Sequence, residues 1–209
     1  MKKIILFLSM ALVSLNVFAQ STDGSERKPY KKEKNKATPG KCPSFFIALS
    51  TGWNNNTGIV GVNAEVPVSQ HFSVDGGVGI STWGEKLYGG AKYFLKPCHF
   101  GWAFGSGITY STGLKNFDDN LPTIDGSTEP VELQLNPQVN LMFAAYRYWA
   151  LGRNKSRFYI ELGYTVPLNG SNRFTQTAGT PIDDVSVETI KILSPGGIIV
   201  AVGFSFGVK

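Results

Sequence analysis

The sequence predicts an all-β fold, an eight-stranded antiparallel up-and-down transmembrane β-barrel. Three observations support this prediction. After residue 43, large apolar residues alternate with small or polar ones at a period of two, as in strands whose two faces differ. No amphipathic helical pattern separates these segments, which favours hairpins over parallel units. Gly (24 residues) and aromatic residues (12%) are frequent, whereas charged residues make up only 17% of the 209 residues. An even number of strands can close into a barrel without unpaired edges.

The chain begins with the pattern of an export signal. Two lysines precede an apolar run from Ile4 to Val13 that is too short to span a bilayer, and Ala19 suits cleavage before Gln20. We therefore expect residues 1–19 to be a signal peptide of an exported protein. An uncleaved membrane anchor is the alternative.

Residues 20–43 are expected to be a disordered, basic periplasmic tail. Seven Lys+Arg and three Asp+Glu fall within 21–41, with almost nothing apolar to bury. The tail is either a solvated linker or a contact for an anionic periplasmic partner. Residues 42–209 contain eleven basic and twelve acidic residues, a net charge of −1, so the +5 of the whole chain comes from the residues before them. A basic nucleic-acid-binding domain is therefore not expected.

The barrel is expected to occupy residues 44–209, with strands of about ten residues, the length that crosses a membrane in a tilted barrel. The expected strands are 44–52, 58–68, 71–81, 86–96, 101–111, 131–147, 156–168 and 196–208. In the last one, every second residue from Ile198 to Val208 is a large apolar residue, and mostly small residues lie between them.

The composition of the two strand faces predicts which face meets lipid. The less apolar face is rich in Gly, Ala and Ser, whereas a water-facing exterior normally has many Lys and Glu. An eight-stranded barrel has room inside only for packed side chains, so small residues suit its interior and large apolar ones suit lipid. A soluble periplasmic ligand-binding barrel would have the reverse arrangement. The aromatic residues expected to ring the two membrane interfaces are Trp53, Trp83, Trp102, Tyr110, Tyr146, Tyr148, Trp149 and Tyr164.

Loop lengths predict the orientation. The connections after odd-numbered strands are 53–57, 82–85, 112–130 and 169–195, and those after even-numbered strands are 69–70, 97–100 and 148–155. Outer-membrane barrels have long outer loops and short periplasmic turns. Both termini are therefore expected in the periplasm.

The signal peptide, the eight alternating segments and the aromatic-rich last strand (GIIVAVGFSFGVK) resemble the small outer-membrane β-barrels of Gram-negative bacteria, the OmpA/OmpX-like superfamily. The resemblance covers roughly residues 44–209 and lies in the pattern, not in an invariant motif. It implies insertion by the outer-membrane assembly machinery among outer-membrane lipid and lipopolysaccharide. One departure is that Phe206 is followed by three further residues, whereas such barrels usually end in an aromatic residue.

Cys42 and Cys98 are both expected on the periplasmic side, where export permits a disulfide. Cys42 precedes the first strand and Cys98 lies in the turn after the fourth, so a bridge would cross the barrel mouth. Two free thiols are the alternative.

A group of charged residues is expected to face inward by strand parity: Glu65, Asp75, Lys92 and Glu161. One interpretation is a salt-bridge network that fills the lumen, and the other is a narrow, charge-lined ion path. Glu132 and Arg157 are candidates to join this group.

No catalytic, cofactor or metal site is expected. His71 and His99 fall in periplasmic turns, whereas acyl-transfer enzymes of the resembled fold pair a His with a Ser near the outer leaflet. Two separated histidines without a third ligand do not define a metal site. The carboxylates of 116–130 lack the spacing of a calcium loop. This segment is therefore interpreted as a solvated loop, or as a loop that binds lipopolysaccharide weakly through bridging divalent cations.

We therefore expect a monomeric, non-enzymatic outer-membrane barrel with a packed lumen. Its role would be structural, or would be surface interaction through the outer loops 112–130 and 169–195. A small pore or transport component is one alternative, and the soluble periplasmic barrel is another.

Overall fold

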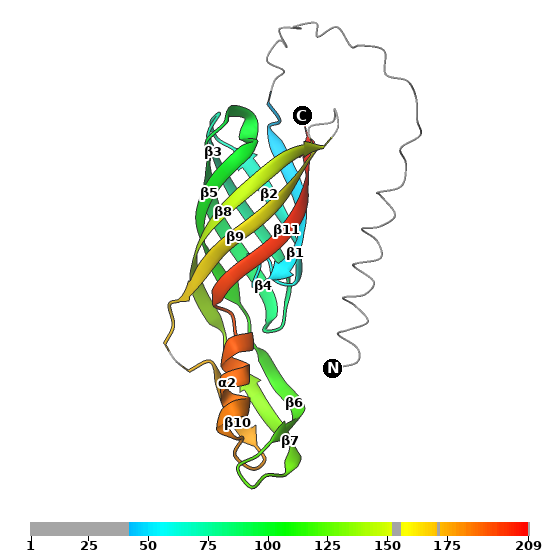
Figure 1. The fold of residues 1–209 in the computed structure, drawn as a ribbon, viewed down its shortest axis with the longest axis vertical. Helices are drawn as coiled ribbons and strands as arrows, with labels where there is room; N and C mark the ends of the chain where they lie inside the picture. Colours follow the sequence, from blue (N-terminus) through cyan, green and yellow to red (C-terminus); the bar gives the residue numbers. More distant parts are fainter. Residues whose placement is uncertain (1–41, 152–155, 171, 209) are drawn as a thin grey trace, which may run out of the picture. The chain divides into compact units, whose positions relative to one another are not determined.

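The computed structural model describes residues 42–151, 156–170 and 172–208. These residues belong to one compact unit of the chain, Lys41–Lys209. Eight antiparallel strands form a closed barrel, which confirms the predicted all-β barrel fold (Figure 1). The expected signal peptide, and the expected tail as far as residue 41, lie outside the described residues.

The barrel strands follow one another around the ring in chain order. They are β1 (Phe45–Trp53), β2 (Val60–Pro67), β3 (Phe72–Ser81), β4 (Gly84–Phe94), β5 (Gly101–Ser111), β8 (Gln138–Leu151), β9 (Ser156–Pro167) and β11 (Gly197–Val208). The ring closes where β1 pairs with β11, from Phe45 opposite Val208 to Trp53 opposite Val200. No barrel strand is left with an unpaired edge.

The barrel has two open ends. We call the end where β1 begins and β11 ends the terminal mouth; it includes the short helical turn Pro97–His99 between β4 and β5. We call the opposite end, where β1 ends at Trp53, the far mouth. Because β1 and β5 are four strands apart in a ring of eight, they lie on opposite sides of the barrel.

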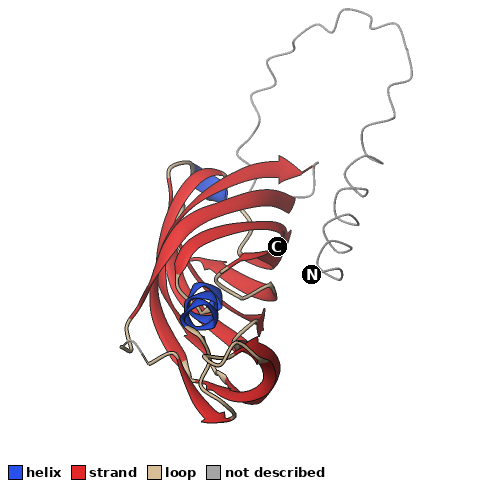
Figure 2. Ribbon diagram, turned by 60° about the horizontal axis from the view of Figure 1, so that its bottom comes forward, coloured by secondary structure: helices blue, strands red, loops and turns tan. Residues whose placement is uncertain are grey.

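The two longest connections at the far mouth are folded, and are not the plain loops that the sequence predicted. β6 (Leu114–Pro122), β7 (Thr128–Leu135) and β10 (Phe174–Ala178) form a three-stranded sheet, which we call the outer sheet, and α2 (Asp184–Leu193) packs with it (Figures 1 and 2). This ten-residue helix was not predicted from the sequence.

The predicted single strand over 131–147 is wrong. Residues 131–135 belong to β7 of the outer sheet, and β8 of the barrel begins only at Gln138. Pro137 lies between them and has no N–H group to donate to a strand ladder. The alternation of apolar residues continues in step on both sides of this break, so periodicity alone could not reveal it.

The outer sheet has a small apolar core of its own. Val131 and Leu133 of β7 and Ile182 are buried there, and further residues pack against them: Leu121, Phe174, Val187 and Ile190. Val131 and Leu133, predicted to lie on the outer face of the barrel, therefore pack against α2 and the outer sheet instead.

The outer face of the barrel is apolar around the whole ring, as the alternation predicts. Each strand has at least one large apolar side chain in its middle part that is exposed: Leu49, Val62, Val78, Leu87, Phe104, Phe143, Leu162 and Val200. The facing inner positions are buried. Within the described ranges, no helix has the length and apolar character needed to cross a membrane.

Of the eight aromatic residues predicted to ring the membrane interfaces, five lie on the outside of the barrel and three do not. Trp53, Trp102, Tyr110, Trp149 and Tyr164 lie exposed on the outside. The other three, Trp83, Tyr146 and Tyr148, are buried. The two tyrosines have the inward parity of β8, and the Trp83 indole N–H donates to the carbonyl of Asn136 at 2.8 Å between the β3–β4 hairpin and the start of β8.

Candidate functional site: the lumen and its two mouths

Ion pairs inside the barrel link β2, β3, β4 and β9 on the side of the lumen that faces the terminal mouth. Lys92 Nζ lies 2.6 Å from Asp75 Oδ2 and 3.5 Å from Glu65 Oε2, and Arg157 Nη2 lies 2.7 Å from Glu65 Oε1. The strand register explains this grouping, because Glu65 of β2 stands directly opposite Asp75 of β3. All four side chains are almost fully buried. Two acids and two bases are therefore balanced inside the barrel.

The other candidates for this network lie elsewhere. Glu161 is buried, and its Oε1 accepts a hydrogen bond from the Tyr146 hydroxyl at 3.1 Å instead of pairing with a base. Glu132 lies in β7 of the outer sheet and does not reach the lumen. Arg157 does join the network, through Glu65.

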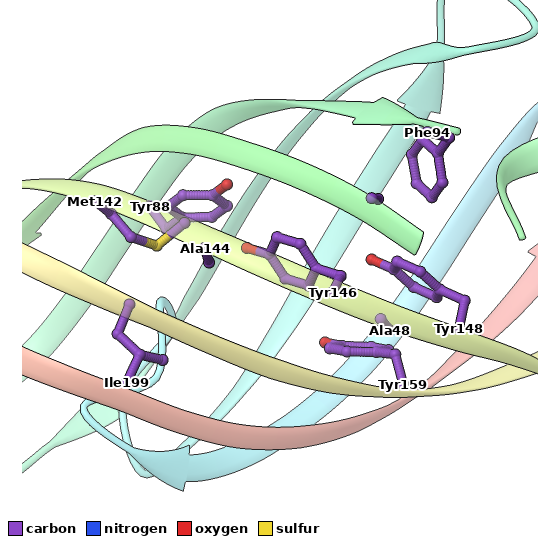
Figure 3. Close-up of a cluster of buried hydrophobic side chains, with 10 residues drawn as sticks. Ala48, Tyr88, Phe94, Met142, Ala144, Tyr146, Tyr148, Tyr159 and Ile199 are labelled. Carbon is purple, nitrogen blue, oxygen red and sulfur yellow. The ribbon is translucent and has the colours of Figure 1, made fainter. Parts of the chain in front are cut away.

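Buried tyrosines fill the lumen beside these charges (Figure 3). Tyr146 and Tyr148 of β8 and Tyr159 of β9 lie with ring centroids between 5.1 and 6.2 Å apart. The Lys92 ammonium lies 4.7 Å from the centroid of the Tyr146 ring. A Cβ on Gly203 of β11 would overlap the Tyr159 ring. The small residues of one strand thus leave the space that large rings of another strand occupy.

A disulfide crosses the terminal mouth. Cys42, before β1, is bonded to Cys98, in the turn after β4, with a Cα–Cα distance of 5.0 Å. Because β1 and β5 lie on opposite sides of the ring, the segment before β1 must extend across this mouth to form the bond. Of the two alternatives left open by the sequence, the structure contains the bridge.

The turn that holds Cys98 is folded into the terminal mouth. The His99 side chain is buried, and its ring centroid lies 4.5 Å from that of Phe94. Its carbonyl accepts a hydrogen bond from Arg157 Nη1 at 2.6 Å. Burial lowers the pKa of the His99 imidazole, so this histidine is held in its neutral form.

Arg157 is the central side chain of this mouth. Besides Glu65 and the His99 carbonyl, its guanidinium contacts two aromatic faces, with Cζ 3.7 Å from the Phe46 centroid and 4.4 Å from that of Tyr148. A planar cation stacks well on aromatic faces, which a lysine at this position could not reproduce.

The far mouth is closed by the turn between β1 and β2. Asn55, Asn56 and Thr57 are fully buried there, although an outer loop was predicted over 53–57. Ser50 Oγ and Thr57 Oγ1 share a hydrogen bond of 2.9 Å, and Asn55 Nδ2 donates to Ser50 Oγ at 2.9 Å. We call residues Asn54–Thr57 the inner turn.

Lys86 of β4, which stands opposite Gly79 of β3, contacts the inner turn. Its Nζ donates to the Asn55 carbonyl at 2.8 Å, and it is almost fully buried. No pattern in the sequence connects this lysine with a turn so far away in the chain. Its partner is a backbone carbonyl, which no residue pattern identifies.

Neither histidine is part of a metal-binding group. His71 lies in the turn between β2 and β3, where its Nδ1 is 2.7 Å from the Phe94 carbonyl oxygen. In the part of the chain that the structure describes, no three His, Cys, Asp or Glu side chains are grouped to hold a metal ion. Asp118 and Asp119, expected in a loop, are exposed on β6.

Comparison of the sequence with protein-family models and with curated proteins gives no match. Side chains with paired charges and stacked rings fill the lumen, and turns that fold inward cover both mouths. This arrangement can resist solvent and ion passage.

Proposed function

We propose that this protein is an integral outer-membrane β-barrel whose lumen is closed by its own side chains and turns. The observation that supports the proposal is the inverted distribution of polarity. Exposed aliphatic and aromatic residues surround the barrel, whereas Glu65, Asp75, Lys92 and Arg157 are buried inside it. A continuous apolar belt is unusual on a protein dissolved in water, and lipid would cover it. The export signal expected at residues 1–19 agrees with this location.

A role in structure or surface interaction fits the remaining features. A closed lumen leaves the outer sheet and α2 as the part available to partners on the far side of the membrane. This part has its own apolar core of Val131, Leu133 and Ile182, so it can present a defined surface and not a flexible loop. We propose no catalytic role, because among the described residues no Ser, Thr or Cys side chain in the lumen is hydrogen-bonded to a His ring that could activate it.

A matched pair of arginine substitutions tests the membrane location. Val202 lies on the outer face in the middle of β11, and Val185 is exposed on α2. In a barrel inserted in lipid, Val202→Arg should cost about 2–4 kcal/mol of folding free energy, and Val185→Arg should cost little. Urea unfolding of the barrel in phospholipid vesicles measures both.

Equal, small effects of the two substitutions, with recovery of the native protein in the soluble periplasmic fraction, would contradict the membrane location and favour the soluble barrel. Heat-modifiable migration in detergent gels provides the folding control for each variant.

A small pore is the second candidate, and one observation favours it. Ser111, Gln138 and Asn140 are polar side chains that line the lumen next to the far mouth. Recordings in planar bilayers distinguish the two candidates. We expect the native protein to give no steady conductance. Steady channels formed by single proteins would contradict the closed barrel and favour the pore.

A further inference from the structure

The inner turn has a seat built for it in the barrel wall. Three glycines of β2 and β3, Gly61, Gly77 and Gly79, lie against Thr57, and a Cβ on any of them would overlap an atom of that residue. The lack of side chains at these positions leaves the volume that the turn occupies. The inward position of the turn is therefore specified by residues outside it.

Side-chain hydrogen bonds hold the turn to Ser50, Thr165 and Gly196, and a further one involves a buried charge. Lys86 Nζ donates to the carbonyl of Asn55 at 2.8 Å and approaches that of Asn54 at 3.4 Å. Among the described residues, no carboxylate lies within ion-pair distance of Lys86. A buried ammonium that has only carbonyl partners is costly, and it loses those partners if the turn leaves.

Polar side chains that line the lumen beside Lys86 lack hydrogen-bond partners. Ser111 and Gln138 stand beside Lys86 in the strand register, and Asn140 lies one inward position further along β8. Ser111 Oγ, Asn140 Oδ1 and both amide atoms of Gln138 have no hydrogen-bond partner among the described residues. Each such buried group costs free energy that exposure to water would recover. Asn56 Oδ1 and Nδ2 of the turn itself are also without a partner among the described residues, so hydration favours the open arrangement.

The turn is connected to the folded part outside the barrel. Asn54 Nδ2 donates to the Gly196 carbonyl at 2.5 Å, and the Gly196 N–H approaches Asn54 Oδ1 at 3.4 Å. Gly196 lies between the end of α2 at Leu193 and the start of β11 at Gly197. A displacement of the segment after α2 would therefore act directly on the inner turn.

We propose that the inner turn, Asn54–Thr57, is a movable plug of the far mouth and that Lys86 is its latch. When the plug leaves its seat, water enters a polar compartment lined by Lys86, Ser111, Gln138 and Asn140. The terminal mouth stays closed by the Cys42–Cys98 bridge and the His99 turn. The opening therefore exposes a vestibule at one end of the lumen and not a continuous channel.

Cysteine accessibility tests the plug. The full chain carries Asn56→Cys, and its two native cysteines are bonded to each other. A small charged methanethiosulfonate reagent is used, and Asp125→Cys provides the reference rate for an exposed site. We expect Asn56→Cys to react at least about tenfold more slowly than the reference, because the residue is buried while the plug is seated.

Two independent second substitutions should release the plug. Lys86→Met removes the latch, and Gly61→Ala places a methyl group where Thr57 sits. Either should raise the reaction rate of Asn56→Cys about tenfold or more, the effect of losing one hydrogen bond to a charged group. The matched controls are Lys115→Met, at an exposed lysine of β6, and Gly89→Ala, where an added Cβ has no neighbour within 4 Å. Neither control should change the rate.

Reaction of Asn56→Cys at the reference rate in the otherwise native chain would overturn the plug. Unchanged slow reaction in both Lys86→Met and Gly61→Ala would overturn its movement. If Lys86→Met does not show the heat-modifiable shift of a folded barrel, Gly61→Ala alone decides the movement. Because the reaction can be measured in detergent, its outcome is independent of whether the barrel is placed in the outer membrane.

Discussion

The two mouths of the barrel are closed in different ways. At the terminal mouth, a disulfide, an arginine with an ion pair, and stacked aromatic rings cover the lumen. At the far mouth, a four-residue polar turn is held by hydrogen bonds and a single lysine. The first closure resists opening unless a covalent bond and several desolvated contacts are lost together. The second can open at the cost of a few hydrogen bonds.

The difference follows from the residues beneath each closure. Phe46 and Phe94 pack against His99 and would be exposed to water if its turn left. The inner turn instead carries the unpartnered polar atoms of Asn56, and Ser111 and Gln138 beside Lys86 are polar as well, so all of them would be hydrated. A cover over apolar rings is stabilised by burial, whereas a cover over unpartnered polar groups is not. The kind of residue covered, and not the length of the turn, decides whether a mouth opens.

Among the changes considered, Arg157→Met at the terminal mouth is expected to lower the stability most. This change leaves Glu65 without its closest base and the His99 carbonyl without its donor. Removing one member of a buried pair should lower the free energy of unfolding by about 3–5 kcal/mol. Urea unfolding measures this, with Lys191→Met as control, because its ion pair with Glu188 is exposed and contributes about 0–1 kcal/mol. A loss as small as that of the control would show that Arg157 does not hold this mouth.

Removal of the disulfide separates the two mouths. The double change Cys42→Ser and Cys98→Ser frees a loop closed over a sequence separation of 56 residues and should cost about 2–4 kcal/mol of stability. The reaction rate of Asn56→Cys at the far mouth should stay unchanged, because no described contact joins the two regions directly. A faster reaction at the far mouth would mean that the mouths are coupled.

A milder change loosens the far mouth. Ser50 Oγ accepts from Asn55 and shares a hydrogen bond with Thr57, so Ser50→Ala removes two contacts of the inner turn. We expect a loss of about 1 kcal/mol in unfolding and a faster reaction of Asn56→Cys. The result is compared with Ser73→Ala, a buried serine near the terminal mouth whose hydroxyl has no partner among the described residues. If Asn56→Cys reacts at the same rate in the Ser50→Ala and Ser73→Ala backgrounds, the hydrogen bonds of Ser50 do not hold the turn.

The smallest effect is expected at α2, beyond the far mouth. The Asp183 carboxylate accepts from the Ser186 N–H at 2.8 Å, and this hydrogen bonding holds the pKa of Asp183 below its ordinary value of 3.8. Because the folded pKa is the lower one, the stabilisation of α2 is present above about pH 4 and is lost as the pH falls through the folded pKa. Hydrogen-exchange protection of the α2 amides measures it.

Asp183→Asn keeps an oxygen acceptor at the start of the helix and loses the titrating proton, so its α2 protection should not depend on acid pH. Asp183→Ala should reduce protection at every pH. Equal acid sensitivity of Asp183→Asn and the native chain would assign the effect to another group.

The alternation of residues predicted most of the barrel, because the inner and outer faces of a strand are chemically different. Seven of the eight expected strands match described strands within about three residues at each end. The eighth prediction joined β7 to β8 across Pro137, since the core of the outer sheet demands the same alternation as a barrel wall. The helix α2 was missed because Val187 and Ile190 bury only a short apolar stripe.

The lumen could be predicted only in part. Parity indicated that Glu65, Asp75, Lys92 and Glu161 point inward, but not that Arg157 closes the network while Glu161 bonds to Tyr146. Which inward residues meet depends on the stagger between strands around the ring, and a single sequence does not contain that stagger.

By itself, the sequence determined that the chain forms strands with one apolar and one less apolar face, because side-chain direction repeats every two residues. It also determined that the cysteines could be bridged, because Cys42 precedes the first strand and Cys98 follows the fourth, which places both at the same end of the barrel. Only the tertiary structure decided how each mouth closes. The seat of the inner turn is made by Gly61, Gly77, Gly79 and Lys86. Strand pairing places Gly61, Gly79 and Lys86 in one row, but the turn folds inward against them only in the closed barrel, which no local pattern encodes.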